Sequence, residues 1–302
     1  MRDLEKYRGV IPAFYACYDE DGEISAERTE ALALHFLKKG VKGLYVNGSS
    51  GECIYQSVED RKKVLEHVMK VVGGKLTIIA HVACNNTKDS VELAAHAEKL
   101  GVDAIAAIPP IYFHLPDHAI ADYWNDISAA APHTDFVIYN IPQLAGVALS
   151  PYLFKKMREN PNVIGVKNSS MPVQDIQIFK ALGGEDSIVF NGPDEQFVGG
   201  RLMGADGGIG KGIVLVQSGI GKVNAAVCAQ ILIDSFAVDE IISALCAGYG
   251  SMYAIIKEVL KKREGIDIGG VRKPQAGVIP EDQAVIDHAA ELIDKAMENF
   301  IR

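Results

Sequence analysis

The 302-residue sequence predicts an α/β fold, a closed (β/α)8 barrel with a C-terminal helical extension. Short apolar runs alternate with stretches of helical periodicity, eight such runs occur, and no change in composition divides them. Apolar residues make up 48% of the chain and charged residues 23%, values typical of a globular protein. This composition excludes intrinsically disordered, collagen-like and disulfide-stapled chains.

The predicted strands are mostly uninterrupted apolar runs, as expected for parallel strands that are buried on both faces. They span residues 9–14, 43–46, 76–81, 104–107, 136–140, 163–166, 188–191 and 207–210. Helices are predicted between the strands. Residues at positions typical of helix starts are Ser25, Ser57 with Asp60, Thr87, and Ser150 before Pro151.

The strand pattern stops at about residue 218, and residues 223–235, 238–262 and 281–300 have helical periodicity. No linker rich in Pro, Gly or Ser separates this part from the barrel, so we expect it to pack on the barrel. The predicted division is a catalytic barrel over residues 1–217 and a helical region over residues 218–302.

Charge and segment composition restrict the partners and the compartment. The net charge of −9 argues against a general nucleic-acid or anionic-membrane surface. The N-terminus lacks an apolar leader segment, and polar residues and prolines interrupt the longest uncharged stretch, residues 136–154, so no membrane-spanning helix is predicted. The five cysteines show no CxxC spacing, which favours reduced thiols in the cytoplasm.

In such a barrel, catalytic side chains lie where the strands end. Residues 47–52 (NGSSGE) follow the second predicted strand, and their small residues could form a pocket of backbone N–H groups and hydroxyls for a carboxylate or phosphate. An ordinary turn is the alternative. Tyr139 ends the fifth strand and is either a proton relay or a core aromatic residue.

Two lysines follow predicted strands. Lys167 comes directly after residues 163–166, and burial there would favour a neutral amine that can attack a carbonyl carbon. A lysine that extends to the rim is the alternative. Lys211 follows residues 207–210, and the pattern alone does not choose between the two lysines.

The remaining polar residues carry weaker signals. Asp194 and Glu195 follow the seventh strand and could bind sugar hydroxyls or simply begin a helix. The glycine-rich residues 204–212 match neither common nucleotide-binding motif. Pro116 separates His114 from His118 and no HExxH motif occurs, so no metal site is predicted.

The motifs GSSGE (48–52) and YNIP (139–142) and the strand-end Lys167 occur in the same order as in the class I pyruvate-dependent aldolases. The chain resembles this family, which contains N-acetylneuraminate lyase and dihydrodipicolinate synthase, from about residue 8 to residue 210 and more weakly around 248–257. The resemblance implies a TIM-barrel enzyme in which Lys167 forms a Schiff base with the keto carbon of pyruvate, without a metal or organic cofactor.

The resemblance also implies roles for other residues. Ser49 and Ser50 would hold the pyruvate carboxylate, and Tyr139 would relay a proton. Tyr112 matches a tyrosine that in this family reaches the site of a neighbouring subunit, and the family implies a homotetramer.

Within the family the chain is more similar to the lyase branch. Leu144 stands where the synthase carries an arginine for a second carboxylate, and an apolar side chain cannot pair with that charge. The positions that match lyase contacts to the hydroxylated sugar tail are Ser169, Gly192, Asp194 and Glu195. The implied reaction is the reversible cleavage of N-acetylneuraminate, a sialic acid, to pyruvate and N-acetylmannosamine.

One segment departs from the family. Lys211 and the residues after it replace a hydroxyl contact of the lyase, and the sequence to about residue 240 is unlike the family. Two alternatives therefore remain at this point. One is another aldolase of the family, acting on a 2-keto-3-deoxy sugar acid or resembling the synthase. The other is a barrel that binds pyruvate or a sugar without turnover.

Overall fold

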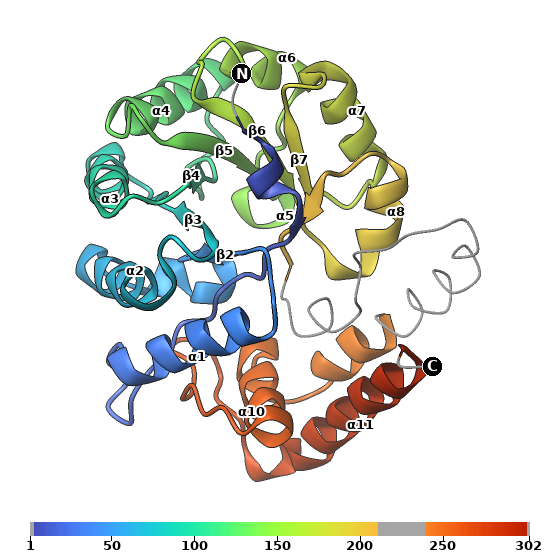
Figure 1. Cartoon of the computed structure of the whole chain (residues 1–302). Coiled ribbons are helices and arrows are strands. Elements are labelled where there is room, and N and C mark those ends of the chain that lie inside the picture. Colours follow the sequence, from blue (N-terminus) through green and yellow to red (C-terminus); the bar gives the residue numbers. More distant parts are fainter. Residues whose placement is uncertain (1–2, 211–238, 301–302) are drawn as a thin grey trace.

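The computed structural model describes residues 3–210 and 239–300, with side chains up to residue 297. Eight parallel strands form one sheet in the order β1-β8-β7-β6-β5-β4-β3-β2, with helices around it (Figure 1). Backbone hydrogen bonds from Tyr45 N to Pro12 O (2.9 Å) and from Phe14 N to Tyr45 O (2.8 Å) join the segment after β1 to β2 and close the ring. The predicted barrel is confirmed.

The strands lie close to their predicted positions. Their bounds are β1 (Gly9–Val10), β2 (Gly43–Val46), β3 (Thr77–His81), β4 (Ala104–Ala107), β5 (Asp135–Asn140), β6 (Val163–Asn168), β7 (Ile188–Asn191) and β8 (Gly207–Gly208). Of the strand predicted at 9–14, only residues 9 and 10 form a regular hydrogen-bonded strand, because Pro12 has no N–H group to donate. Its backbone still pairs with the end of β8, since Ile11 N donates to Gly208 O at 2.9 Å.

The bounds of the helices are α1 (Ala26–Lys38), α2 (Val58–Val72), α3 (Thr87–Leu100), α4 (Asp117–Ala129), α5 (Pro142–Ala145), α6 (Pro151–Met157), α7 (Gln174–Gly183), α8 (Phe197–Leu202), α10 (Met252–Glu264) and α11 (Gln283–Phe300). Helices α1, α2 and α6 begin directly after the predicted capping residues Ser25, Ser57 and Ser150, and α3 begins at Thr87 with Asn86 as its cap. The side chains of Ser25, Ser57 and Ser150 each accept a hydrogen bond from the backbone N–H three residues on.

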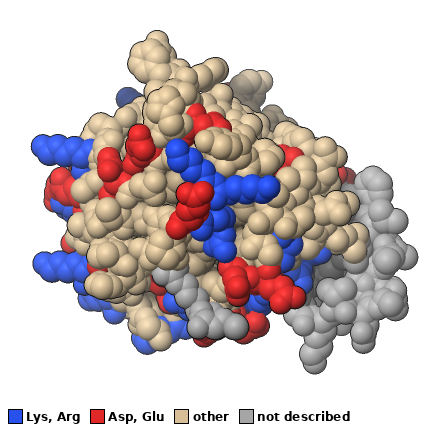
Figure 2. Space-filling view, turned by 90° about the horizontal axis from the view of Figure 1, so that it is seen from above, with Lys and Arg blue, Asp and Glu red and all other residues tan. Residues whose placement is uncertain are grey.

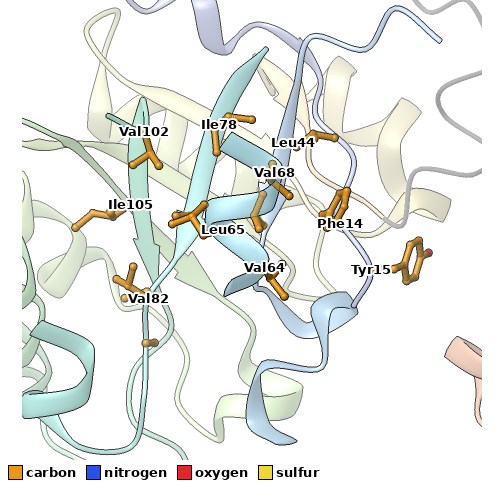
Figure 3. Packing of buried hydrophobic residues seen from close by; sticks show 14 of the residues in the cluster. Phe14, Tyr15, Leu44, Val64, Leu65, Val68, Ile78, Val82, Val102 and Ile105 are labelled. Atoms are coloured by element: carbon orange, nitrogen blue, oxygen red, sulfur yellow. The ribbon is translucent and has the colours of Figure 1, made fainter. Parts of the chain in front are cut away.

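The apolar residues form two layers. One fills the barrel interior and includes Tyr7, Ile79, Val137 and Phe190. The other lies between the strands and the surrounding helices; Figure 3 shows part of it, where Val64, Leu65 and Val68 of α2 face Ile78 and Leu44 of the sheet. Burial on both faces explains why the strands read as continuous apolar runs.

The C-terminal part differs from its prediction in one respect. A continuous helix over 238–262 is wrong, because the described helical residues 239–245 end before a glycine-containing turn at 246–250. Ser251 then starts α10 by accepting a hydrogen bond from Ala254 N. The last helix, predicted at 281–300, is confirmed as α11. The helix predicted at 223–235 and the predicted boundary between residues 217 and 218 lie outside the described residues.

The C-terminal helices pack on the barrel near α1 (Figure 1). Lys39, which follows α1, forms an ion pair of 2.9 Å with Glu264 of α10, and Ile255 belongs to the same apolar cluster as Phe14. None of the helices that the structure describes is both long and apolar enough to cross a membrane. On the face shown in Figure 2, basic and acidic side chains are intermingled and form no patch of one sign.

Candidate active site

A cavity of 220 Å³ opens at the carboxyl ends of the strands. The predicted residues that line it come from four separate strand ends and are Ser49, Ser50, Tyr139, Lys167, Ser169, Gly192, Asp194 and Glu195. Residues from positions 49 to 195 therefore meet at one place, as the barrel topology requires. Tyr112 does not line this cavity. Lys211, the alternative candidate for the nucleophilic lysine, lies outside the described residues.

A bulge in β6 turns Lys167 toward the barrel interior. Phe136 pairs with Val163 but Val137 pairs with Gly165, so β6 carries one extra residue at this point. Side chains of a regular strand alternate between its faces, and Ile164 faces the interior. Without the extra residue Lys167 would face the surrounding helices. Gly165 makes the bulge possible because its φ is +156° and a Cβ there would lie 1.8 Å from Ile188 O.

Lys167 therefore lies inside the strand rather than behind it, and its side chain is only 5% exposed. Its Nζ lies 3.8 Å from the centre of the Tyr139 ring and 4.4 Å from the centre of the Tyr45 ring. No carboxylate among the described residues forms an ion pair with it. The amine is thus buried between two aromatic rings in the strand-end cavity, where it can reach a bound carbonyl carbon.

The neighbours of Lys167 are neutral. The Tyr45 and Tyr139 rings meet edge to face with centres 5.8 Å apart, and the His81 ring lies 6.0 Å from Tyr139. Burial, with the charges of Arg61 and Lys167, holds the pKa of His81 well below its usual value. Burial also raises the pKa of Tyr45 well above its usual value. The imidazole and the phenol therefore stay uncharged at neutral pH.

Two hydroxyl groups line the same cavity as the amine. Ser49 and Ser50 belong to a single 3-10 turn, Ser49–Gly51, directly after β2. Both line the cavity that contains Lys167. A hydroxyl pair beside a buried amine suits a 2-oxo acid, since the hydroxyls can donate to its carboxylate while the amine attacks its keto carbon.

The loop after β7 forms another wall of the cavity. Gly192 N donates to Asn168 O at 2.8 Å, and a Cβ on Gly192 would lie 1.9 Å from Ser169 Oγ. Glycine is therefore required for this close approach. Asp194 is buried, Glu195 is half-buried, and both line the cavity with Ser169. Their carboxylates are suited to accept hydrogen bonds from substrate hydroxyls.

Tyr112 is exposed to solvent and does not contribute to the cavity of its own chain. Its side chain is 85% exposed, and its φ of +83° is unusual for a residue other than glycine. The ring meets that of Phe113 edge to face, with centres 4.9 Å apart, and Phe113 is 71% exposed. An exposed pair of adjacent aromatic rings is typical of a contact surface.

Several residues of the site escaped the sequence analysis. His81 ends β3, so the rule that predicted Tyr139 could have found it. Tyr253 and Gln143 also line the cavity, and Gln143 Nε2 donates to Ser169 O at 2.9 Å. Tyr253 lies on α10, far from any strand end, and the weaker resemblance around 248–257 was the only signal for it.

A larger cavity of 620 Å³ adjoins the first and shares Ser49, Leu144 and Tyr253 with it. Lys167 does not line it, so the smaller cavity is the candidate active site. Within the described part of the chain no group of three or more His, Cys, Asp or Glu side chains is placed to hold a metal ion.

The profile of the Dihydrodipicolinate synthetase family matches residues 6–289. An N-acetylneuraminate lyase of Mediterraneibacter gnavus is 62% identical over 305 aligned positions, which cover 100% of this chain and 97% of that protein. An N-acetylneuraminate lyase of Enterobacter sp. is 37% identical over 68% of this chain and 69% of that protein. The structure of a catalytic-lysine mutant of Ruminococcus gnavus sialic acid aldolase superposes with a TM-score of 0.96 at 62% identity, covering 99% of this chain and 100% of that one.

Proposed function

The chain belongs to the Dihydrodipicolinate synthetase family, and we propose that it is a lyase that reversibly cleaves N-acetylneuraminate to pyruvate and N-acetylmannosamine. The observation that carries this proposal is the buried Lys167 amine beside Ser49 and Ser50 in one cavity. The named activity of relatives at 62% identity agrees with it.

The first step joins the substrate to the enzyme. The Lys167 amine attacks the keto carbon C2 of the open-chain sugar acid, and loss of water leaves an iminium ion. Ser49 and Ser50 hold the substrate carboxylate during this step. The site needs no metal or organic cofactor for it, because the iminium itself accepts the electrons of the bond that breaks.

The second step cleaves the carbon chain. Tyr139 relays the proton from the C4 hydroxyl, the C3–C4 bond breaks, and its electron pair moves to the iminium to form an enamine. N-acetylmannosamine leaves as an aldehyde. Protonation of the enamine at C3 and hydrolysis of the iminium then release pyruvate and restore the Lys167 amine.

The sugar tail is proposed to lie along the loop after β7. Ser169, Gly192, Asp194 and Glu195 line that side of the cavity. Hydrogen bonds from sugar hydroxyls to these two carboxylates favour a polyhydroxylated substrate over a short aldehyde acid. The carboxylate end is thus assigned to the turn after β2 and the sugar end to the loop after β7.

The alternatives have less support. A synthase-like reaction needs a cation for a second carboxylate, and Leu144 lines the cavity at the matching position. A barrel without turnover was suggested by the unusual segment 211–240. The alignment with the M. gnavus lyase covers 100% of this chain and therefore includes that segment.

A panel assay tests the proposed substrate. Purified enzyme is incubated with N-acetylneuraminate, two 2-keto-3-deoxy sugar acids and a synthase substrate pair, and pyruvate release or consumption is measured. We expect the highest kcat/KM with N-acetylneuraminate. Faster turnover of a 2-keto-3-deoxy sugar acid would contradict the proposal.

We also propose a homotetramer in the cytoplasm. The exposed Tyr112 and Phe113 supply an aromatic contact to a second copy of the chain, on which Tyr112 would reach the neighbouring site. Among the described residues Cys17, Cys53, Cys84 and Cys246 are unpaired, which suits a reducing compartment. Sedimentation of the wild type and of Tyr112→Ala tests the assembly, and a monomeric wild type would contradict it.

A further inference from the structure

Glu52, the last residue of the GSSGE motif, has no role in the proposed reaction, although it lies directly beside the site. Its φ of +54° is in the left-handed region, which is uncommon for a glutamate. Its carboxylate is fully buried, accepts a hydrogen bond from Lys257 Nζ at 2.9 Å and another from Arg272 N at 2.9 Å. A buried charge with such complete pairing is retained for a structural or functional reason.

Lys257 connects this motif to the C-terminal region. Its side chain is 1% exposed, and its Nζ also donates to Gly270 O and lies 4.8 Å from the centre of the Tyr18 ring. Because Lys257 belongs to α10, the ion pair fastens that helix to the loop that carries Ser49 and Ser50.

Tyr253 lies one helical turn before Lys257 and therefore on the same side of α10. It lines the 220 Å³ cavity together with Lys167, and its hydroxyl is hydrogen bonded to Ser50. The ring is fixed edge-on against Tyr15, with centres 6.4 Å apart. Burial raises the pKa of Tyr253 to about 12, so the hydroxyl keeps its proton at neutral pH and can donate it to a hydrogen bond.

We propose that Tyr253 is a further substrate-binding residue, which adds a third hydroxyl to Ser49 and Ser50 at the carboxylate of the 2-oxo acid. In this proposal, which rests on the proposed function, the Glu52–Lys257 ion pair is a positioning device that sets the distance between Tyr253 and Ser50. The geometry explains why a motif otherwise made of small residues ends in a buried glutamate.

The variant Tyr253→Phe removes one oxygen and keeps the ring. The pyruvate concentration that half-saturates borohydride trapping should rise about tenfold, the loss expected for one hydrogen bond to a charged group. The kcat at saturating N-acetylneuraminate should change far less, since the proton relay is untouched. Tyr249→Phe is the matched control, because Tyr249 is 75% exposed in the turn before α10 and should leave the half-saturating concentration unchanged.

A double-mutant cycle tests the positioning role. The variant Glu52→Gln/Lys257→Gln replaces the ion pair by two amides, and we expect it to raise the half-saturating pyruvate concentration by about the same factor as Tyr253→Phe. Adding Tyr253→Phe to this variant should then produce no further increase. Fully multiplicative effects of the two changes would show that the ion pair acts independently of Tyr253, and an unchanged half-saturating concentration in the Glu52→Gln/Lys257→Gln variant would show that it acts only on stability; either result would overturn the positioning role.

The outcomes for Tyr253→Phe separate this inference from the proposed function. If the wild type forms no reducible adduct with pyruvate, the proposed function itself fails. If the wild type is trapped and Tyr253→Phe has the same half-saturating concentration, Tyr253 is not a binding residue and only this inference fails. A fall in kcat without a change in half-saturation would also overturn it, because the hydroxyl would then act in a later step.

Discussion

Replacing Gly165 by alanine should damage both the stability and the reactivity of the barrel. An added Cβ would lie 1.8 Å from Ile188 O and 2.7 Å from Ile188 C, and Gly165 pairs with Ile188 across the sheet. Relief of this clash requires β6 or β7 to move. Overpacking costs about 1–3 kcal/mol, and a left-handed backbone adds about 1–3 kcal/mol. The sum of about 2–6 kcal/mol is a large share of the roughly 5–15 kcal/mol that stabilises a typical domain.

The comparison with Gly101→Ala separates the clash from the backbone strain. Gly101 has a φ of +76° with no atom within 4 Å of an added Cβ, so alanine there should cost only about 1–2 kcal/mol. The melting temperature, followed by circular dichroism, should therefore fall more for Gly165→Ala. Its rate of borohydride trapping at limiting pyruvate should also fall, because movement of β6 displaces Lys167. Equal melting temperatures of the two variants, with wild-type trapping, would refute the bulge argument.

Three further changes have distinct expected results. Tyr139→Phe should lower kcat at least about a hundredfold while pyruvate trapping persists, and an unchanged kcat would remove the proton relay. Asp194→Ala should raise KM for N-acetylneuraminate without changing the half-saturation of pyruvate trapping; a parallel change in both would remove its role at the sugar tail. His81→Gln should make the melting temperature fall less steeply as the pH is lowered. Because the folded-state pKa of His81 is depressed, the unfolded chain takes up the proton first as the pH falls below about 6.5, which costs up to about 1.4 kcal/mol per pH unit. Equal slopes of melting temperature against pH for the two proteins would contradict this.

Local patterns predicted the barrel because its strands are buried on both faces. The runs at 43–46, 104–107 and 188–191 coincide with β2, β4 and β7, and Ser25, Ser57 and Ser150 cap the helices that they were expected to start. These signals depend on residues close together in the sequence. The continuous helix predicted at 238–262 is wrong for the same reason: apolar periodicity continues across the turn at 246–250, although Gly248 and Gly250 interrupt the helix there.

Parts of the site that depend on contacts between distant segments could not be predicted from the sequence. The strand-end rule placed Lys167 behind β6, but the bulge at Gly165 arises from its pairing with Val137 and cannot be recognised from β6 alone. Tyr253 lines the cavity from α10, and the ion pair between Glu52 and Lys257 of the same helix joins residues 205 positions apart. The roles predicted for Ser49, Ser50 and Tyr139 had a local signal in their motifs, and those roles stay predictions.

The most direct test of the reaction is the identity of the residue that carries pyruvate after borohydride reduction. The wild-type protein is incubated with pyruvate and borohydride, digested, and analysed by mass spectrometry, with Lys167→Ala treated in parallel. We predict one adduct, at Lys167, and none in the variant. An adduct on Lys211, or one that persists in Lys167→Ala, would contradict the assignment of the nucleophile.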